Sequence, residues 1–182
     1  MSVKYTIDGY GQLELNNVAF RRDGRIEAQC ALSAEDFSEE VPAENGMILA
    51  VDKVNGLIKL PTDTTLPVAL HYSSEHMYDE RHPGLKNWAL VPGTFCPRMG
   101  YLSVGDLFTT NCLCYNNTDY TTEEALETAL AACAETAVYG KTDASGRICL
   151  TKTAPTSGLK LKVVKYYTLA DGQKAVKLQV IG

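Results

Sequence analysis

The 182-residue sequence lacks any long apolar run and contains few histidines and a single tryptophan. No stretch approaches the roughly 20 apolar residues that a helix needs to cross a bilayer. Residues 1–9 also lack the apolar segment of a signal peptide. We therefore expect a protein that is made and folds in the cytoplasm and has no membrane partner. Basic residues are in the minority, with 17 Lys and Arg against 22 Asp and Glu. This balance disfavours nucleic acid as a partner, because a polyanion requires a cationic surface.

Familiar catalytic and cofactor motifs are missing as well. The sequence has no Gly-x-Ser-x-Gly nucleophile elbow and no Gly-x4-Gly-Lys-Ser/Thr phosphate loop. Cys112 and Cys114 form a Cys-x-Cys, but no second pair lies at zinc spacing, so we interpret them as core residues of a strand. All six cysteines are expected to be free thiols, because disulfides do not persist in a reducing compartment. We predict no enzyme activity, no cofactor and no metal. A Cys–His pair formed only in space, as in a thiol hydrolase, stays open as an alternative.

Turn signals are abundant and predict a mainly β protein. Asp23-Gly24, Asn55-Gly56 and Asp171-Gly172 supply the positive φ that tight hairpins need. Each lies between two β-type runs: 12–20 with 25–32, 47–52 with 57–60, and 160–168 with 175–181. The pattern predicts antiparallel hairpins that form a β-barrel or sandwich-like domain.

One short α-helix is predicted at about 122–134. A capping threonine precedes it, Glu124 stands in capping-box position, and apolar residues recur on one face. We divide the chain into an N-terminal arm and hairpin at 1–45 and a main β-rich domain at 46–182. Within the main domain, residues 75–100 are rich in Pro and Gly and are expected to form a long loop.

The remaining signal is for contact surface. Ten of the fifteen aromatic residues are tyrosines, a residue type enriched at interfaces. Aromatic, methionine and arginine side chains concentrate in and near the loop and at the first predicted hairpin tip, where arginine can act as an interface anchor. The candidate partner-interface residues are Arg21, Arg22, Met77, Tyr78, Arg81, Trp88, Arg98 and Tyr101.

Charge is unevenly distributed along the chain. Residues 141–182 carry eight Lys and Arg and two acids, a net charge of +6, whereas residues 1–140 carry nine bases and twenty acids, a net charge of −11. Such polarity can direct the two parts toward different surfaces, or toward each other in an assembly. The alternation of Lys160 and Lys162 with Leu159, Leu161 and Val163 instead indicates the wet face of a half-buried strand.

Three stretches are similar to segments of small structural proteins of tailed bacteriophages. They are residues 46–62, residues 68–78 and residues 97–111, and the C-terminal hairpin extends the similarity. The resemblance implies a virion protein of the capsid-decoration (cement or auxiliary) type, made in the cytoplasm of a bacterial host. Such proteins bind the outer surface of the shell, often as homotrimers, and clamp neighbouring subunits of the major capsid protein. The family offers no catalytic residues to carry over.

Two other functions stay open at this point. The chain is alternatively a tail or baseplate component of the virion. It is also consistent with a binding module for host-surface glycan that uses the Trp88 loop as a stacking platform. These alternatives differ in partner, so particle incorporation and glycan binding separate them.

Overall fold

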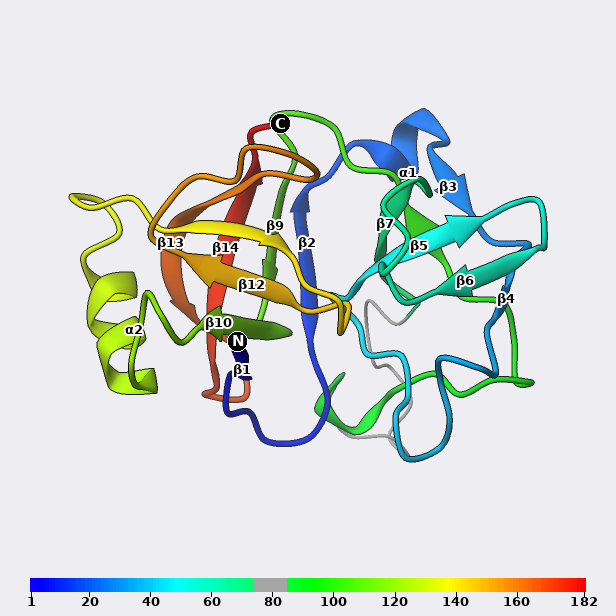
Figure 1. Ribbon diagram of the computed structural model, residues 1–182, viewed down its shortest axis with the longest axis horizontal. Helices are drawn as coiled ribbons and strands as arrows, with labels where there is room; N and C mark the ends of the chain where they lie inside the picture. The colour runs from blue at the N-terminus through cyan, green and yellow to red at the C-terminus, as the bar shows by residue number, and fades with distance from the viewer. Residues whose placement is uncertain (74–84) are drawn as a thin grey trace.

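Two β-sheets lie side by side in the computed structural model, which describes residues 1–73 and 85–182 (Figure 1). The larger sheet has eight strands in the order β1-β10-β12-β11-β13-β14-β9-β2, and the smaller has six in the order β3-β8-β7-β5-β6-β4. The two-sheet, mainly β form of the prediction is therefore confirmed. The sheets do not close into a barrel.

The elements are short, and their bounds are as follows. The eight-stranded sheet contains β1 (Ser2–Lys4), β10 (Leu113–Asn116), β12 (Ile148–Thr151), β11 (Tyr139–Thr142), β13 (Leu161–Thr168), β14 (Lys174–Val180), β9 (Leu107–Thr110) and β2 (Leu13–Asn17). The six-stranded sheet contains β3 (Ile26–Glu27), β8 (Met99–Gly100), β7 (Val68–His71), β5 (Ile48–Asp52), β6 (Leu57–Lys59) and β4 (Ala31–Leu32). The helices are α1 (Phe20–Asp23), α2 (Glu123–Ala131) and the 3₁₀ turn η1 (Leu85–Asn87).

Two of the three predicted hairpins form. β5 pairs with β6 and β13 pairs with β14, both antiparallel, and the glycines at their turns, Gly56 and Gly172, have φ of +66° and +88°. The pairs β10–β12 and β4–β6 are parallel, which the expectation of antiparallel hairpins did not include. Parallel neighbours come from segments far apart in the chain, so turn signals do not reveal them.

The predicted hairpin over 12–32 is wrong. β2 pairs with β9 in the larger sheet, whereas β3 pairs with β8 in the smaller one. Phe20 is completely buried and begins the additional helix α1, which Gly24 ends in the left-handed conformation. The Asp23-Gly24 signal thus belongs to a helix C-cap, where a glycine with positive φ serves equally well.

Residues 1–45 do not form a separate arm, because they supply strands to both sheets. β1 and β2 join the larger sheet, and β3 and β4 join the smaller one. The predicted loop over 75–100 also ends earlier than expected, since Met99–Gly100 is strand β8. Between η1 and β8, Leu90 pairs with Ala43 in an isolated bridge.

The helix α2 is confirmed. The Thr122 hydroxyl accepts a hydrogen bond from the Ala125 amide at 3.2 Å and caps the helix. Since Thr122 is the cap, the third residue after it is Ala125, and Glu124 does not complete a capping box. Leu126 and Leu130 are buried against the larger sheet, as the apolar periodicity predicts.

Two hydrophobic cores result from this arrangement. The first lies between the sheets and contains residues of both, including Ile48, Leu70 and Phe108. The second covers the other face of the smaller sheet and includes Leu49 and Ala69. The smaller sheet is therefore buried on both faces, which explains why all five residues of β5 are buried.

Candidate functional site

Those predicted interface residues that the structure describes lie around β8 but divide between its two faces. Gly100 of β8 packs against the Phe20 ring on the side of the first core, and the Tyr101 side chain packs against the second core. Arg21 and Arg22 are exposed on α1, which anchors through Phe20 on the first side. The structure therefore does not bring these residues into one continuous patch.

Arg98 belongs to the Phe20 side. Its guanidinium donates a hydrogen bond to the Ser73 carbonyl oxygen at 2.8 Å and lies 5.7 Å from the centre of the Tyr72 ring. The Tyr72 ring in turn contacts Phe20, with ring centres 4.9 Å apart. Arg98 is thus an exposed residue whose charged end is held by its own chain.

Trp88 and Tyr101 belong to the opposite side and are partly buried on the second core. The Trp88 ring neighbours the rings of His71 and Phe95, with ring centres 6.0 Å and 6.3 Å away and ring planes tilted by 41° and 32°. Phe95 is 55% exposed and therefore presents the outer end of this aromatic stack to solvent. Sequence reasoning did not select Phe95, because only the fold places it on Trp88. Met77, Tyr78 and Arg81 lie outside the described residues.

A second candidate site lies on the outer face of the larger sheet. The strand register places Lys4, Cys114, Cys149 and Lys141 in one row across β1, β10, β12 and β11. Their neighbours along the strands, Leu113, Ile148 and others, face the first core, so the row faces away from it. Two thiols thus lie side by side between two lysine side chains.

Asp143 completes this group. Its carboxylate oxygen and the sulfurs of Cys114 and Cys149 all lie within 4.8 Å of one another. Asp143 begins a tight turn after β11, in which its amide donates to the Arg147 carbonyl at 3.0 Å. Ser145 donates to the carboxylate through its amide and its hydroxyl, at 3.0 Å and 2.7 Å. We call Cys114, Cys149 and Asp143 the thiol–carboxylate cluster.

Burial and hydrogen bonding shift the pKa values of the groups in the cluster. Cys114 and Cys149 are only 2% and 3% exposed. A hydrogen bond between the two thiols lowers the pKa of Cys149 and raises that of Cys114. Partial burial opposes ionisation of Asp143, but hydrogen bonds from Ser145 and Ser2 hold the pKa of its carboxyl below the ordinary value. The cluster therefore combines a carboxylate whose hydrogen bonds favour its ionised form with two buried thiols.

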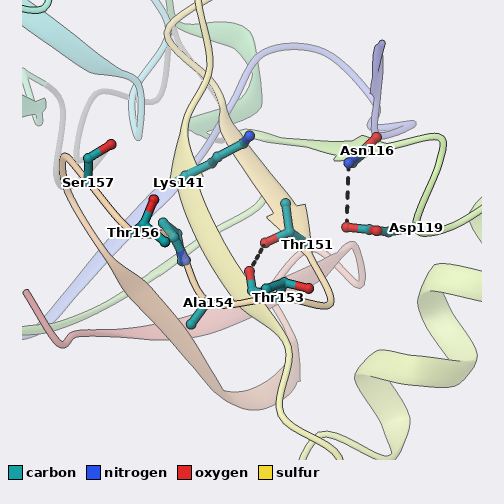
Figure 2. A pocket seen from close by; sticks show the side chains of 9 residues that line it. Asn116, Asp119, Lys141, Thr151, Thr153, Ala154, Thr156 and Ser157 are labelled. Atoms are coloured by element: carbon teal, nitrogen blue, oxygen red, sulfur yellow. Dashed lines mark hydrogen bonds between the residues drawn. The ribbon is translucent and has the colours of Figure 1, made fainter.

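A polar depression of about 360 Å³ (Figure 2) includes in its lining Lys141, the residue next to Cys149 in the row. Asn116, Thr151 and Lys141 line it, and the first two follow Cys114 and Cys149 by two residues on the same sheet face. Two of the lining residues are joined by a hydrogen bond, which the Thr151 hydroxyl donates to the Thr153 carbonyl at 2.8 Å. The cluster therefore lies next to a polar region of the surface.

The other thiols and the described histidine have different surroundings. Both cysteines of the Cys-x-Cys are buried, as predicted, but Cys112 precedes strand β10 and packs in the second core, whereas Cys114 lies within β10 and belongs to neither core. All six cysteines are free. The His71 ring nitrogens are hydrogen-bonded to the Glu44 carbonyl and the Ser73 hydroxyl, at 2.9 Å and 2.7 Å. His71 therefore has no nitrogen left for a catalytic thiol.

Comparisons with protein-family models, curated proteins and solved structures found no match for this chain. In the part of the chain that the structure describes, no helix is both long and apolar enough to cross a membrane.

Proposed function

We propose that this chain is a non-enzymatic virion structural protein of the capsid-decoration type. It binds the outer surface of a shell built by the major capsid protein and stabilises that shell, after synthesis in the cytoplasm of a bacterial host. The proposal draws on the resemblance described for residues 46–62, 68–78 and 97–111 and on one structural observation, the aromatic group that ends in Phe95.

The Phe95 stack is the observation that carries the proposal. Phe95 rests on Trp88, and Trp88 rests on His71, which is completely buried in β7. An exposed aromatic residue with a fixed support loses little conformational entropy on binding. Such preorganised aromatic anchors dominate the energetics of protein interfaces.

Further apolar side chains are exposed in the connections around the smaller sheet. Val41 precedes β5, Val54 lies in the β5–β6 turn, and Val104 follows β8. A decoration protein stabilises the shell through the surface that it buries. Each copy buries an interface of roughly 1,000 Å² or more, and many bound copies together stabilise the shell by mass action. The connections around this sheet supply apolar surface for such a contact.

Self-association fits the charge distribution. On the β13–β14 hairpin, Lys165 and Lys177 are directly opposite each other, and both ammonium groups lie within 6 Å of the centre of the Tyr167 ring. Residues 1–140, by contrast, carry a net charge of −11. We assign this hairpin face to the acidic surface of a second copy, within a homotrimer or other homo-oligomer.

The test is sedimentation with shells assembled from the major capsid protein of the same phage. Wild-type protein should pellet with the shells in many copies and raise their melting temperature. Phe95→Ser should reduce occupancy at least about tenfold, the loss expected for an interface anchor. The matched control is Val3→Ser, which removes an exposed apolar side chain from β1 of the other sheet, outside the β13–β14 hairpin, and should leave occupancy unchanged.

Other outcomes would replace the proposal. Labelled protein found on the tail or baseplate of purified particles would favour that position instead. Binding to host-cell polysaccharide that is lost in Trp88→Ala, without any binding to shells, would favour a glycan-binding module. Absence of the protein from purified virions would exclude all virion roles.

A further inference from the structure

We propose that the thiol–carboxylate cluster of Cys114, Cys149 and Asp143 binds a zinc ion. This site is independent of the proposed capsid function, since it lies on the outer face of the larger sheet, whereas the Phe95 stack lies beside the smaller sheet. Three arguments carry the inference: the spacing of the ligand atoms, their chemistry and the structure that supports them.

The spacing requires only a small contraction. Zinc binds cysteine sulfur at about 2.3 Å and carboxylate oxygen at about 2.0–2.2 Å in a tetrahedral arrangement, which places ligand atoms about 3.5–3.8 Å apart. The two sulfurs and the carboxylate oxygen already lie within 4.8 Å of one another. Side-chain movements of about 1 Å therefore bring the two sulfurs and the carboxylate oxygen into a tetrahedral coordination sphere. The fourth position is left to water.

The donor set selects zinc among the common divalent ions. Thiolates bind zinc well and bind magnesium and calcium poorly, because those harder ions prefer oxygen ligands. Two thiolates, one carboxylate and Zn²⁺ carry a combined charge of −1. Lys4 and Lys141 flank the two cysteines on the same sheet face and compensate that charge. Binding releases the two thiol protons to solvent.

The surroundings hold the ligands in place. The cysteines are fixed by the β10–β12 register, in which Cys114 and Cys149 are direct partners. Ser145 donates two hydrogen bonds to one carboxylate oxygen of Asp143, and Ser2 also donates to this carboxylate. The loop that carries Asp143 ends at Arg147, and the buried ion pair of Arg147 with Glu44 holds that end in place. This is the outer-shell support that zinc ligands require. Asp143 is only partly buried, so the ion has an entry path.

The experiment is metal reconstitution of the reduced full-length chain. After incubation with ZnCl₂ and desalting, elemental analysis should find one zinc per chain. With CoCl₂ in its place, the absorption spectrum should show thiolate-to-cobalt charge transfer and the d–d bands of a tetrahedral ion. Cys114→Ser and Cys149→Ser should lower zinc affinity at least about 100-fold, and Ser145→Ala, which removes only a support, about tenfold.

The matched controls are Cys133→Ser and Cys30→Ser, which remove thiols outside the cluster and should bind zinc as wild type does. Asp143→Asn keeps the size of a side chain in a surface turn, and its circular dichroism spectrum checks that any loss of zinc is not unfolding. Zinc should also raise the melting temperature of wild type but not of Cys149→Ser. Substoichiometric zinc in wild type, or equal binding in Cys149→Ser, overturns the proposal. So does a Cys114–Cys149 disulfide that persists in reductant.

Discussion

Arg147 and Glu44 form an ion pair that is buried between the two sheets. Each side chain is only 7% exposed, and the second carboxylate oxygen of Glu44 accepts a hydrogen bond from the Gly11 amide at 2.6 Å. Arg147 ends the turn before β12, and Glu44 precedes β5, so the pair joins the larger sheet to the smaller one. Buried charges of this kind are tolerated because each has a partner.

Removing one member of this pair should be strongly destabilising. Arg147→Met leaves the Glu44 carboxylate buried without its counter-charge, and we expect the free energy of unfolding to fall by about 3–5 kcal/mol. Urea denaturation followed by circular dichroism measures the loss. Arg22→Met is the control, because Arg22 pairs with Asp23 while 81% exposed, and it should cost less than about 0.5 kcal/mol. Equal effects of the two variants would contradict a structural role for the buried pair.

His71 should make the fold sensitive to acid. Burial lowers the pKa of His71 to about 4, whereas an unfolded histidine titrates near 6.5. Between these values the unfolded chain binds a proton that the folded chain does not, so stability falls as pH decreases from about 6.5 to 4. The full contribution is about 3 kcal/mol. The measurement is the unfolding free energy at pH 7 and pH 4.5 for wild type and His71→Asn. The loss on acidification should be smaller in the variant, and an unchanged loss would refute the assignment.

Two glycines should respond to substitution for different reasons. Gly56 has φ of +66° and open space around it, so Gly56→Val should cost about 1–2 kcal/mol through backbone strain alone, and Gly56→Asn much less. At Gly100 an added Cβ would lie 2.4 Å from the Phe20 ring, so Gly100→Ala must displace a buried aromatic side chain. We expect Gly100→Ala to exceed Gly56→Asn in cost. Thermal melts of the three variants test the order, which would be wrong if Gly56→Asn were the most damaging.

The lysines of the β13–β14 hairpin should oppose folding and support assembly. Lys165 and Lys177 are directly opposite each other, so Lys165→Thr should stabilise the isolated chain by about 0.2–1 kcal/mol. The same change should weaken self-association, and added salt should weaken the wild-type oligomer. Light scattering after size exclusion, at low and high salt, measures the oligomer. Lys152→Thr removes a comparable exposed charge outside the hairpin and should not alter association; a uniform effect of both variants would argue against a specific face.

The sequence by itself determined the mainly β class, the β5–β6 and β13–β14 hairpins and the helix α2. In each case the signal is local. Asn55-Gly56 and Asp171-Gly172, each between two β-type runs, predict the two hairpins, and a capping threonine before apolar residues at helical spacing predicts α2. Local rules succeed there because the interacting residues are neighbours along the chain.

Only the tertiary structure decided which distant segments pair. Burial of Phe20 turns Asp23-Gly24 into a helix cap and separates β2 from β3, and residues on either side of β8 face different cores, which divides the predicted interface. The parallel pairing of β10 with β12 brings Cys114 to Cys149, and the turn between β11 and β12 adds Asp143. Contacts of this kind are selected by the burial of whole strands in a shared core, a long-range effect that no spacing within a short window reports.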